Sequence, residues 1–316
     1  MRDIFLYKAD PVRGAEWARL FARHAPHLDF RIWPATGAPF ADAAEEARVR
    51  FLAAWQPPAD LAALPNLELI FSVGAGVDQL DFSTLPPHVP LLRMVEPGIV
   101  GGMVEYVSLA VLAIHRDWQS YAARQRARQW QAIRVLPAAS RRVGVLGLGS
   151  LAQAALAQLR AFGFACAGWS RSQHTIAGVD CYAGAQALPA FLARCDILVC
   201  LLPLTPATRG ILNAELFAAL PRGAALINTG RGGHLVQDDL LAALDSGQLA
   251  HAVLDVCEPE PPGPEHPFWD HPRITLTPHV ASMTQPEMAV EVVLDNLRRH
   301  AEGLPLQGLV DRGRGY

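Results

Sequence analysis

The chain has 316 residues, more than one compact core usually holds, so two domains are the default expectation. Its formal net charge is −3 and no long run of one sign occurs, which argues against a nucleic-acid binder or a membrane-surface binder. Hydrophobic residues make up 51% of the chain, enough to fill substantial cores.

The cysteines and the N-terminus bear on the compartment. The five cysteines are odd in number and lack a paired, metal-like spacing, which favours a reducing cytoplasm and no metal site. The apolar run at the N-terminus is short before charge returns, so we expect a first strand there rather than a signal peptide. The apolar stretch 197–204 is too short to cross a bilayer. We therefore predict a cytoplasmic protein with no membrane partner.

The first hundred residues predict a domain of alternating strands and helices. We expect, in chain order, a strand at Ile4–Tyr7, a helix at Ala15–Arg23, and strands at Phe30–Trp33, Phe51–Trp55 and Leu67–Val73. The last strand runs into a glycine-rich loop, 74–78, which offers free backbone amides. Residues 103–115 are too uniformly apolar for an exposed helix, so we expect this helix to be buried between domains or subunits. The arginine-rich stretch 116–128 is interpreted as a solvated helix face or a linker.

The sequence Gly-Leu-Gly-Ser-Leu-Ala, which starts at Gly147, ends an apolar strand and opens a helix. Gly147 permits a tight turn, and Gly149 lets the backbone approach a pyrophosphate. The exposed amides of Ser150 and Leu151 would hold its negative charge, and Ala152 is small enough for helix–strand packing. A glycine-rich turn alone is weak evidence, with a purely structural turn as the alternative. The strand before it and the helix after it favour a dinucleotide-binding turn.

The helix predicted after this turn has one apolar face and a defined end. The residues of that face are Leu151, Ala155, Leu159 and Phe162. We expect the helix to end at Gly163 and a second apolar strand to cover Phe164–Trp169.

The residues after this second strand indicate which dinucleotide binds. A site that prefers NAD usually places an acidic residue there, because a carboxylate accepts hydrogen bonds from the ribose hydroxyls. Here the chain has Ser170, Arg171 and Ser172. A guanidinium with two neighbouring hydroxyls can bind a 2′-phosphate through charge-assisted contacts. NADP(H) is therefore favoured, and NAD(H) stays possible because Arg171 has the alternative of a solvated surface arginine.

From residue 142 onward strands and helices alternate, which predicts a parallel sheet with helices on both faces. Expected strands end at Leu146 and Trp169 and cover Ile197–Leu202, Ala224–Asn228, Ala252–Asp255 and Ile274–Thr277, and amphipathic segments cover Asn213–Leu220 and Gln237–Leu244. Ligands of such a sheet bind at the carboxyl ends of its strands. Arg231, Glu260 and His279 each follow one of these strand ends.

These residues belong to motifs that, in their order and spacing, resemble the D-2-hydroxyacid dehydrogenase family over nearly the whole chain. The motifs are Gly74-Ala-Gly-Val-Asp78, the nucleotide turn, Leu202-Pro-Leu-Thr-Pro-Ala-Thr-Arg-Gly210, Gly230-Arg-Gly232, the segment from Asp255 to Glu260-Pro261, and Thr277-Pro-His279. The glyoxylate/hydroxypyruvate reductase branch is similar in further segments: Trp55-Gln-Pro-Pro58, Trp169-Ser-Arg171, 238–247 and 310–316.

The resemblance implies an α/β fold of two doubly wound parallel-sheet domains. A Rossmann-type cofactor domain, residues 99–284, would be inserted into a smaller flavodoxin-like substrate domain, residues 1–98 and 285–316. The C-terminal helix Glu287–Arg299 would return to the first domain. Members of the family are commonly homodimers, and the apolar helix 103–115 resembles the element that joins their subunits.

The side chains suit the reduction of a 2-oxo acid. Such a reaction needs a proton donor for the carbonyl oxygen and a cation that holds the carboxylate. Arg231 provides a planar fork that binds a carboxylate and polarises the carbonyl. His279 can lose and regain a proton near neutrality, and Glu260 would orient the imidazole and favour its protonated form. The alternatives are a surface ion-pair arginine, an exposed proline-rich turn, and Glu258 in the carboxylate role.

The resemblance also implies further contacts. The amides of Gly74, Ala75 and Gly76 would bind the substrate carboxylate. Asp255 would contact the nicotinamide carboxamide, and Leu202, Pro203 and Thr229 would line the cofactor cleft. Trp55 is interpreted either as an apolar wall beside the substrate or as a core residue. Cys257 stands where the family often has Phe, and we expect it to pack rather than act as a nucleophile.

The sequence therefore predicts an oxidoreductase that uses NADPH to reduce glyoxylate or hydroxypyruvate to glycolate or D-glycerate. The nearer alternative is a dehydrogenase for another D-2-hydroxy acid, such as phosphoglycerate or lactate. The more distant alternative is a cofactor-sensing binding protein without catalysis, which the intact set of Arg231, Glu260 and His279 disfavours.

Overall fold

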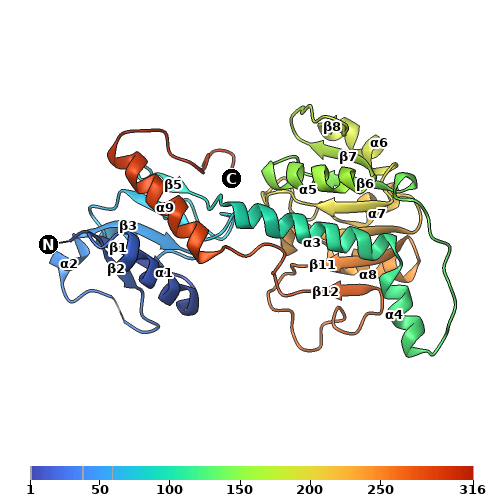
Figure 1. The fold of residues 1–316 in the computed structure, drawn as a ribbon, viewed down its shortest axis with the longest axis horizontal. Coiled ribbons are helices and arrows are strands. Elements are labelled where there is room, and N and C mark those ends of the chain that lie inside the picture. Colours follow the sequence, from blue (N-terminus) through green and yellow to red (C-terminus); the bar gives the residue numbers. More distant parts are fainter. Residues whose placement is uncertain (1, 38, 59, 316) are drawn as a thin grey trace. The chain divides into compact units, whose positions relative to one another are not determined.

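The computed structural model describes residues 2–37, 39–58 and 60–315. The chain forms two compact units (Figure 1). Unit 1 comprises Met1–Ile99 and Met283–Tyr316, and unit 2 comprises Val100–Ser282. The chain passes from one unit to the other at 99–100 and at 282–283, within two residues of the expected domain boundaries.

Unit 1 is built on a five-stranded parallel sheet with the order β2-β1-β3-β4-β5. Its elements are β1 (Ile4–Lys8), α1 (Pro11–His24), β2 (Asp29–Ile32), α2 (Ala43–Glu46), β3 (Val49–Ala54), β4 (Leu69–Ser72), β5 (Leu91–Leu92) and α9 (Pro286–Ala301). This is the flavodoxin-like strand order, so the predicted fold class is confirmed. The short elements α2 and β5 were not predicted.

The two faces of the unit 1 sheet bury different kinds of side chain. Aromatic rings fill the face against α1, where the ring centroid of Phe21 lies 4.5 Å from that of Phe5 and 4.7 Å from that of Phe30. The opposite face packs aliphatic residues such as Leu6 and Leu52. Alternate strand residues point to opposite faces, so Phe5 and Leu6 of β1 lie on different faces of the sheet. Both faces are therefore packed with buried side chains, as expected for a parallel sheet.

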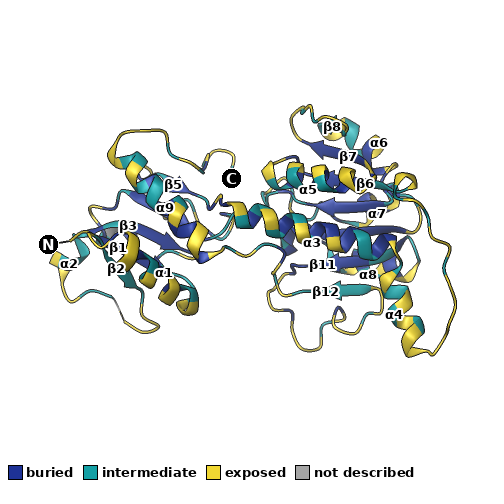
Figure 2. Ribbon diagram, viewed as in Figure 1, coloured by how far each residue is buried: buried dark blue, intermediate teal, exposed yellow. Residues whose placement is uncertain are grey.

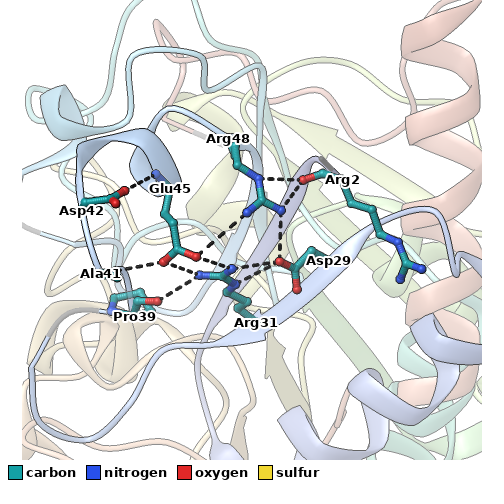
Figure 3. Close-up of polar contacts among 8 residues, drawn as sticks. All are labelled: Arg2, Asp29, Arg31, Pro39, Ala41, Asp42, Glu45 and Arg48. Carbon is teal, nitrogen blue, oxygen red and sulfur yellow. Dashed lines mark hydrogen bonds and ion pairs between the residues drawn. The ribbon is translucent and has the colours of Figure 1, made fainter.

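The edge strand β2 is held by a cluster of charged side chains (Figure 3). The guanidinium of Arg31 donates to Asp29 at 2.9 Å and binds both carboxylate oxygens of Glu45, at 2.9 and 3.0 Å. The hydrogen bond from Arg31, followed by one from the amide of Ala41, lowers the pKa of Glu45 to about 2. These contacts join the segment around α2 to the edge strand.

Unit 2 is built on a seven-stranded parallel sheet with the order β12-β11-β10-β9-β6-β7-β8. Its strands are β6 (Arg142–Leu146), β7 (Ala165–Ser170), β8 (Asp180–Ala183), β9 (Ile197–Cys200), β10 (Ala224–Asn228), β11 (Leu249–Leu254) and β12 (Ile274–Leu276). Its helices are α3 (Pro97–His115, which starts in unit 1), α4 (Trp118–Arg126), α5 (Ser150–Ala161), α6 (Leu188–Leu192), α7 (Ala214–Ala219) and α8 (Gln237–Asp245). This is the predicted Rossmann strand order, here extended by one strand.

Helices cover both faces of the unit 2 sheet (Figure 2). Val143 and Val145 of β6 pack on one face with residues of α3 and α5, whereas Leu146 packs on the other face with residues of α6, α7 and α8. The edge strand β8 was not predicted. The apolar part of its sequence, Asp-Cys-Tyr-Ala, is only three residues long, and its four residues are exposed or half-buried.

Helix α3 is long and apolar enough to pass for a membrane span by length and composition. One of its faces, with Val107 and Val111 fully buried, packs in the core of unit 2 itself. Another face is open within the single chain, where Leu109 is 68% exposed, so the expected burial of this helix between domains or subunits stays a prediction. Phe162 was wrongly predicted to face the core: it follows the last residue of α5 and is 42% exposed.

Candidate active site

Three neighbouring strands of unit 2 bring the predicted catalytic residues to one edge of the sheet. Asn228 of β10 pairs with Leu254 of β11, which pairs with Leu276 of β12. The three strands therefore end at the same level, and Arg231, Glu260 and His279 lie in the loops that follow them. The carboxyl edge of a parallel sheet is where ligands of such folds bind.

Glu260 and His279 form a direct pair. Glu260 Oε2 lies 2.9 Å from His279 Nδ1, and the two side chains are 38% and 34% exposed. Because a carboxylate only accepts hydrogen bonds, Nδ1 carries the shared proton and Nε2 is left to exchange a proton with a ligand. Burial raises the pKa of Glu260, but the hydrogen bond and charge of His279, the amide of Cys257 and the charge of Arg231 outweigh it, so the pKa lies below its ordinary value. The carboxylate therefore stays charged at neutral pH.

Glu258, the alternative for the carboxylate role, is engaged elsewhere. Its carboxylate accepts a hydrogen bond from Arg209 Nη1 at 2.8 Å. The carboxylate partner of His279 is therefore Glu260, whereas Glu258 links the loop after β11 to Arg209.

The main chain around His279 is held in place by Asp255. His279 has a left-handed backbone with φ of +54°, and its amide donates to the carbonyl oxygen of Asp255 at 2.8 Å. The Asp255 carboxylate, 1% exposed, accepts the amides of Val280 and Ala281, both at 2.8 Å. An unfavourable φ persists only where the surroundings determine it strongly, and Asp255 supplies that constraint. Its predicted contact with a nicotinamide carboxamide stays a prediction.

A hydroxyl pair extends this support to helix α3. Thr277 Oγ1 donates to Asp255 Oδ1 at 2.7 Å, so it must accept the proton of Tyr106, whose hydroxyl oxygen is 2.5 Å away. Burial, together with the charge of Asp255, raises the pKa of Tyr106 to about 12, which keeps its hydroxyl a donor. Neither Tyr106 nor this role of Thr277 was predicted, since the contact joins segments far apart in the sequence.

The turn that carries Arg231 is fixed by the residue at the end of β10. Asn228 is fully buried, and its side chain donates to the Arg231 carbonyl at 3.1 Å and accepts the Gly230 amide at 3.2 Å. Arg231 itself is half-buried. Its guanidinium therefore extends from a turn whose main chain is set by side-chain hydrogen bonds.

The predicted dinucleotide turn is closely packed at Gly147 and open at Gly149. Gly147 has φ of +95°, and a Cβ there would lie 2.8 Å from the Leu201 carbonyl oxygen, so only glycine fits. A Cβ at Gly149 would meet no protein atom within 4 Å. Gly149 caps α5 without a side-chain hydrogen bond, and Ser150, the first helical residue, is exposed. The first amides of the helix are thus available to an anion, and these residues fit the cofactor.

The segment after β7 departs from the prediction at one residue. Arg171 and Ser172 are exposed, as a phosphate site needs, but Ser170 is 8% exposed and its hydroxyl donates to the Ser172 carbonyl at 2.7 Å. The Ser170 proton is therefore used within the loop, and Arg171 and Ser172 are the side chains that face solvent.

The other residues predicted to line the cofactor cleft follow β9 and β10. Leu202 and Thr229 are buried and Pro203 is half-buried. Their contacts with a cofactor stay predictions. Cys257 is buried, and burial followed by the charge of Glu260 raises the pKa of its thiol to about 11, which agrees with a packing role. Within residues 2–37, 39–58 and 60–315, no group of three His, Cys, Asp or Glu side chains is placed to hold a metal ion.

The predicted substrate loop lies in unit 1, after β4. The amide of Gly74 donates to Ser72 Oγ at 3.3 Å, so the predicted carboxylate site rests on the amides of Ala75 and Gly76. Trp55 is 38% exposed, and a Cβ on Gly74 would lie 3.2 Å from its ring. Trp55 is thus a wall of this loop rather than a core residue, and its contact with a substrate stays a prediction.

Comparisons with known proteins place these observations in context. The sequence profile described as "D-isomer specific 2-hydroxyacid dehydrogenase, NAD binding domain" matches residues 108–281, which lie within unit 2. The structure of a D-isomer specific 2-hydroxyacid dehydrogenase from Xanthobacter autotrophicus Py2, in complex with NADPH and MES, is 40% identical, with 100% of both chains covered and a TM-score of 0.93.

Two further solved structures match over the full length of both chains. The NADPH-dependent glyoxylate/hydroxypyruvate reductase from Sinorhizobium meliloti, in complex with NADP and sulfate, is 39% identical, with 100% of both chains covered and a TM-score of 0.89. The probable 2-hydroxyacid dehydrogenase from Rhizobium etli CFN 42, in complex with NADP, HEPES and L(+)-tartaric acid, is 34% identical, with 100% of both chains covered and a TM-score of 0.88.

Gly232, next to Arg231, provides a test of how the loops support one another. A Cβ there would lie 2.0 Å from the carbonyl carbon of Cys257, in the loop that leads to Glu260. We expect Gly232→Ala to displace Glu260 from His279 and to lower kcat/KM for 2-oxo acid reduction about 100-fold, as a shift near 1 Å can. The measurement is steady-state kinetics, with a melting curve to confirm folding.

Gly263→Ala is the matched control for this variant. A Cβ at Gly263 would meet no atom within 4 Å, so we expect kinetics like those of the wild type. Equal kcat/KM in the two variants would show that the contact between Gly232 and Cys257 does not hold Glu260 in place.

Proposed function

The chain belongs to the D-isomer specific 2-hydroxyacid dehydrogenases, and from this premise we propose that it uses NADPH to reduce glyoxylate or hydroxypyruvate to glycolate or D-glycerate. The observation that carries the proposal is the 2.9 Å contact between Glu260 Oε2 and His279 Nδ1, with Arg231 after the adjacent strand. This arrangement combines a proton donor with a cation at the carboxyl edge of the unit 2 sheet.

Each residue of the site has a defined task in the proposed reaction. The nicotinamide supplies a hydride to the carbonyl carbon when the cofactor is bound. His279 Nε2 gives a proton to the carbonyl oxygen, and Glu260 keeps the ring oriented and offsets the positive charge of its protonated form. Arg231 binds the substrate carboxylate and polarises the carbonyl. In the reverse direction His279 takes the proton back.

The cofactor is expected to bind along the carboxyl edge of the unit 2 sheet. The matched profile is that of an NAD binding domain, and the open amides at the start of α5 suit its pyrophosphate. The exposed Arg171 favours NADPH over NADH, because a guanidinium forms charge-assisted contacts with a 2′-phosphate. The relatives from X. autotrophicus Py2 and S. meliloti were crystallised with NADPH and NADP.

The choice of glyoxylate or hydroxypyruvate rests on similarity. The S. meliloti relative is described as an NADPH-dependent glyoxylate/hydroxypyruvate reductase. The alternative is reduction of another 2-oxo acid by the same residues. A cofactor-sensing protein without catalysis is disfavoured, because such a protein does not need the Glu260–His279 pair.

We also propose that the protein is a homodimer. Residues 118–137, here called the arm, comprise α4 and the segment after it. The segment turns back along the helix, since the Ile133 amide donates to the Tyr121 hydroxyl at 2.8 Å. Helix α4 buries none of its residues, and the arm exposes Trp118 at 69%, Trp130 at 105% and Val135 at 63%. Exposed apolar surface of this kind is typical of a protein interface.

The cytoplasm remains the proposed compartment. All five cysteines are free thiols and four of them are buried, as in a reducing environment. Cell fractionation that recovers the protein with membranes or secreted material would contradict this.

The first test is an assay of purified protein with NADPH and glyoxylate, hydroxypyruvate, pyruvate or phenylpyruvate. We expect glyoxylate and hydroxypyruvate to have the highest kcat/KM, followed as the loss of NADPH absorbance. His279→Ala should lower kcat at least 100-fold, because general acid–base catalysis contributes about that much. Lack of turnover with all four acids, or turnover that survives His279→Ala, would contradict the proposal.

The second test concerns the cofactor. We expect Arg171→Asp to lower kcat/KM for NADPH about 100-fold and to change that for NADH less than threefold or so, because only NADPH carries the 2′-phosphate. Arg222→Asp makes the same charge change at another exposed position of unit 2 and should leave both values unchanged. Equal losses with the two cofactors in Arg171→Asp would mean that Arg171 does not bind the phosphate.

The third test concerns the oligomeric state. We expect sedimentation equilibrium to give twice the chain mass of 34.2 kDa, and Trp130→Asp to shift the equilibrium toward the monomer. Val12→Asp, which changes an exposed residue of unit 1, is the control. A wild-type monomer at micromolar concentration would refute the dimer.

A further inference from the structure

His234 contacts two loops of unit 2 at once, and the proposed reaction gives it no task. Its side chain is fully buried, at 0% exposure. Ring atom Nδ1 lies 3.0 Å from the amide nitrogen of Arg231, and Nε2 lies 3.3 Å from the carbonyl oxygen of Pro203. One imidazole therefore contacts the main chain of Arg231, which is proposed to bind the carboxylate, and the main chain of Pro203, which is expected to line the cofactor cleft.

The geometry selects one protonation state of this ring. An amide N–H only donates and a carbonyl oxygen only accepts, so Nδ1 is unprotonated and Nε2 carries the proton. In the other neutral tautomer Nδ1–H could donate to the Arg231 carbonyl oxygen, 3.1 Å away, but the bare Nε2 would then oppose the Pro203 oxygen. In the charged ring both nitrogens carry protons, so the hydrogen bond from the Arg231 amide would be lost and a charge would be buried. The neutral Nε2–H form satisfies both loops.

The surroundings of the ring leave it little room to move. A Cβ on Gly230 would lie 3.0 Å from Nδ1 of His234 and 3.2 Å from the carbonyl oxygen of Leu202. The two loops thus close on the imidazole from the Arg231 side and from the Pro203 side. Because buried groups are close-packed, a change in the ring displaces at least one of these loops.

We propose that His234 is a positioning residue: one ring nitrogen positions the residue that binds the oxo acid, and the other positions the residue that lines the cofactor cleft. Nδ1 fixes the main chain of Arg231, and so the guanidinium that binds the oxo acid. Nε2 fixes the main chain of Pro203, and so the wall of the cofactor cleft. This inference rests on the proposed function, because it takes Arg231 as the carboxylate-binding residue.

Two substitutions separate the two nitrogens. The amide oxygen of Asn occupies nearly the place of Nδ1, whereas the amide nitrogen of Gln reaches nearly the place of Nε2. We expect His234→Gln to raise KM for the best oxo acid of the assay about tenfold, the loss of one hydrogen bond, with KM for NADPH within twofold or so. We expect His234→Asn to raise KM for NADPH by a similar factor and to leave KM for the oxo acid nearly unchanged.

The control is His251→Gln, which replaces another histidine of unit 2, in β11, outside the site. It should change neither KM. If both His234 variants alter the two KM values in parallel, or alter only the melting temperature, His234 has a general structural role and the inference fails. If Arg231→Lys leaves KM for the oxo acid unchanged, the proposed function itself fails, so the two failures are distinguishable.

A measurement on the wild-type protein keeps the proposal testable if the variants do not fold. Nitrogen-15 NMR of the histidine-labelled protein reports which ring nitrogen carries a proton. We expect His234 to show a protonated Nε2 and an unprotonated Nδ1 that accepts a hydrogen bond. A protonated Nδ1 would overturn the inference.

Discussion

The parallel alignment of β10, β11 and β12 is the constraint on which the candidate site depends. Their pairing places the ends of the three strands at one level, so that the loops after them begin side by side. Arg231, Glu260 and His279 come from separate stretches of the sequence, and only this alignment brings them to one edge. The loops then hold one another through backbone contacts such as that of Gly232 with Cys257. The sheet thus brings the three loops together, and contacts between the loops determine the distances between their side chains.

Most of the fold could be predicted because its signals are local. Apolar runs bounded by glycine, proline and polar residues indicated the central strands, and their alternation with helices indicated parallel sheets. Among the elements that escaped prediction, α2, β5 and β8 are short and lie near sheet edges, where burial and apolar pattern are weakest. Helix α6 also escaped prediction, because its five residues are too few to show a helical period. Phe162 was misplaced because helical periodicity continues past the end of a helix, whereas the chain there leaves the helix axis at Gly163.

The candidate site could be predicted at the level of residues but not of hydrogen bonds. The motifs identify Arg231, Glu260 and His279, and the structure adds that Glu258 is paired with Arg209. The proton of Ser170 and the amide of Gly74 are used within their own loops, which no pattern of residue types reveals. His234 was missed for a related reason: its partners are main-chain atoms, and a main chain has no sequence signature.

In the loop after β12, one residue determines the main-chain conformation and another carries the reactive group: Asp255 holds the main chain, and His279 carries the imidazole. The main chain at position 279 is held by the carboxylate and carbonyl of Asp255 and by neighbouring amides, not by the imidazole. Evolution could therefore exchange the side chain at position 279 and keep the loop, whereas a change at Asp255 would alter the loop whatever residue it carried. The shape of this loop is thus expected to tolerate substitution less well at Asp255 than at position 279.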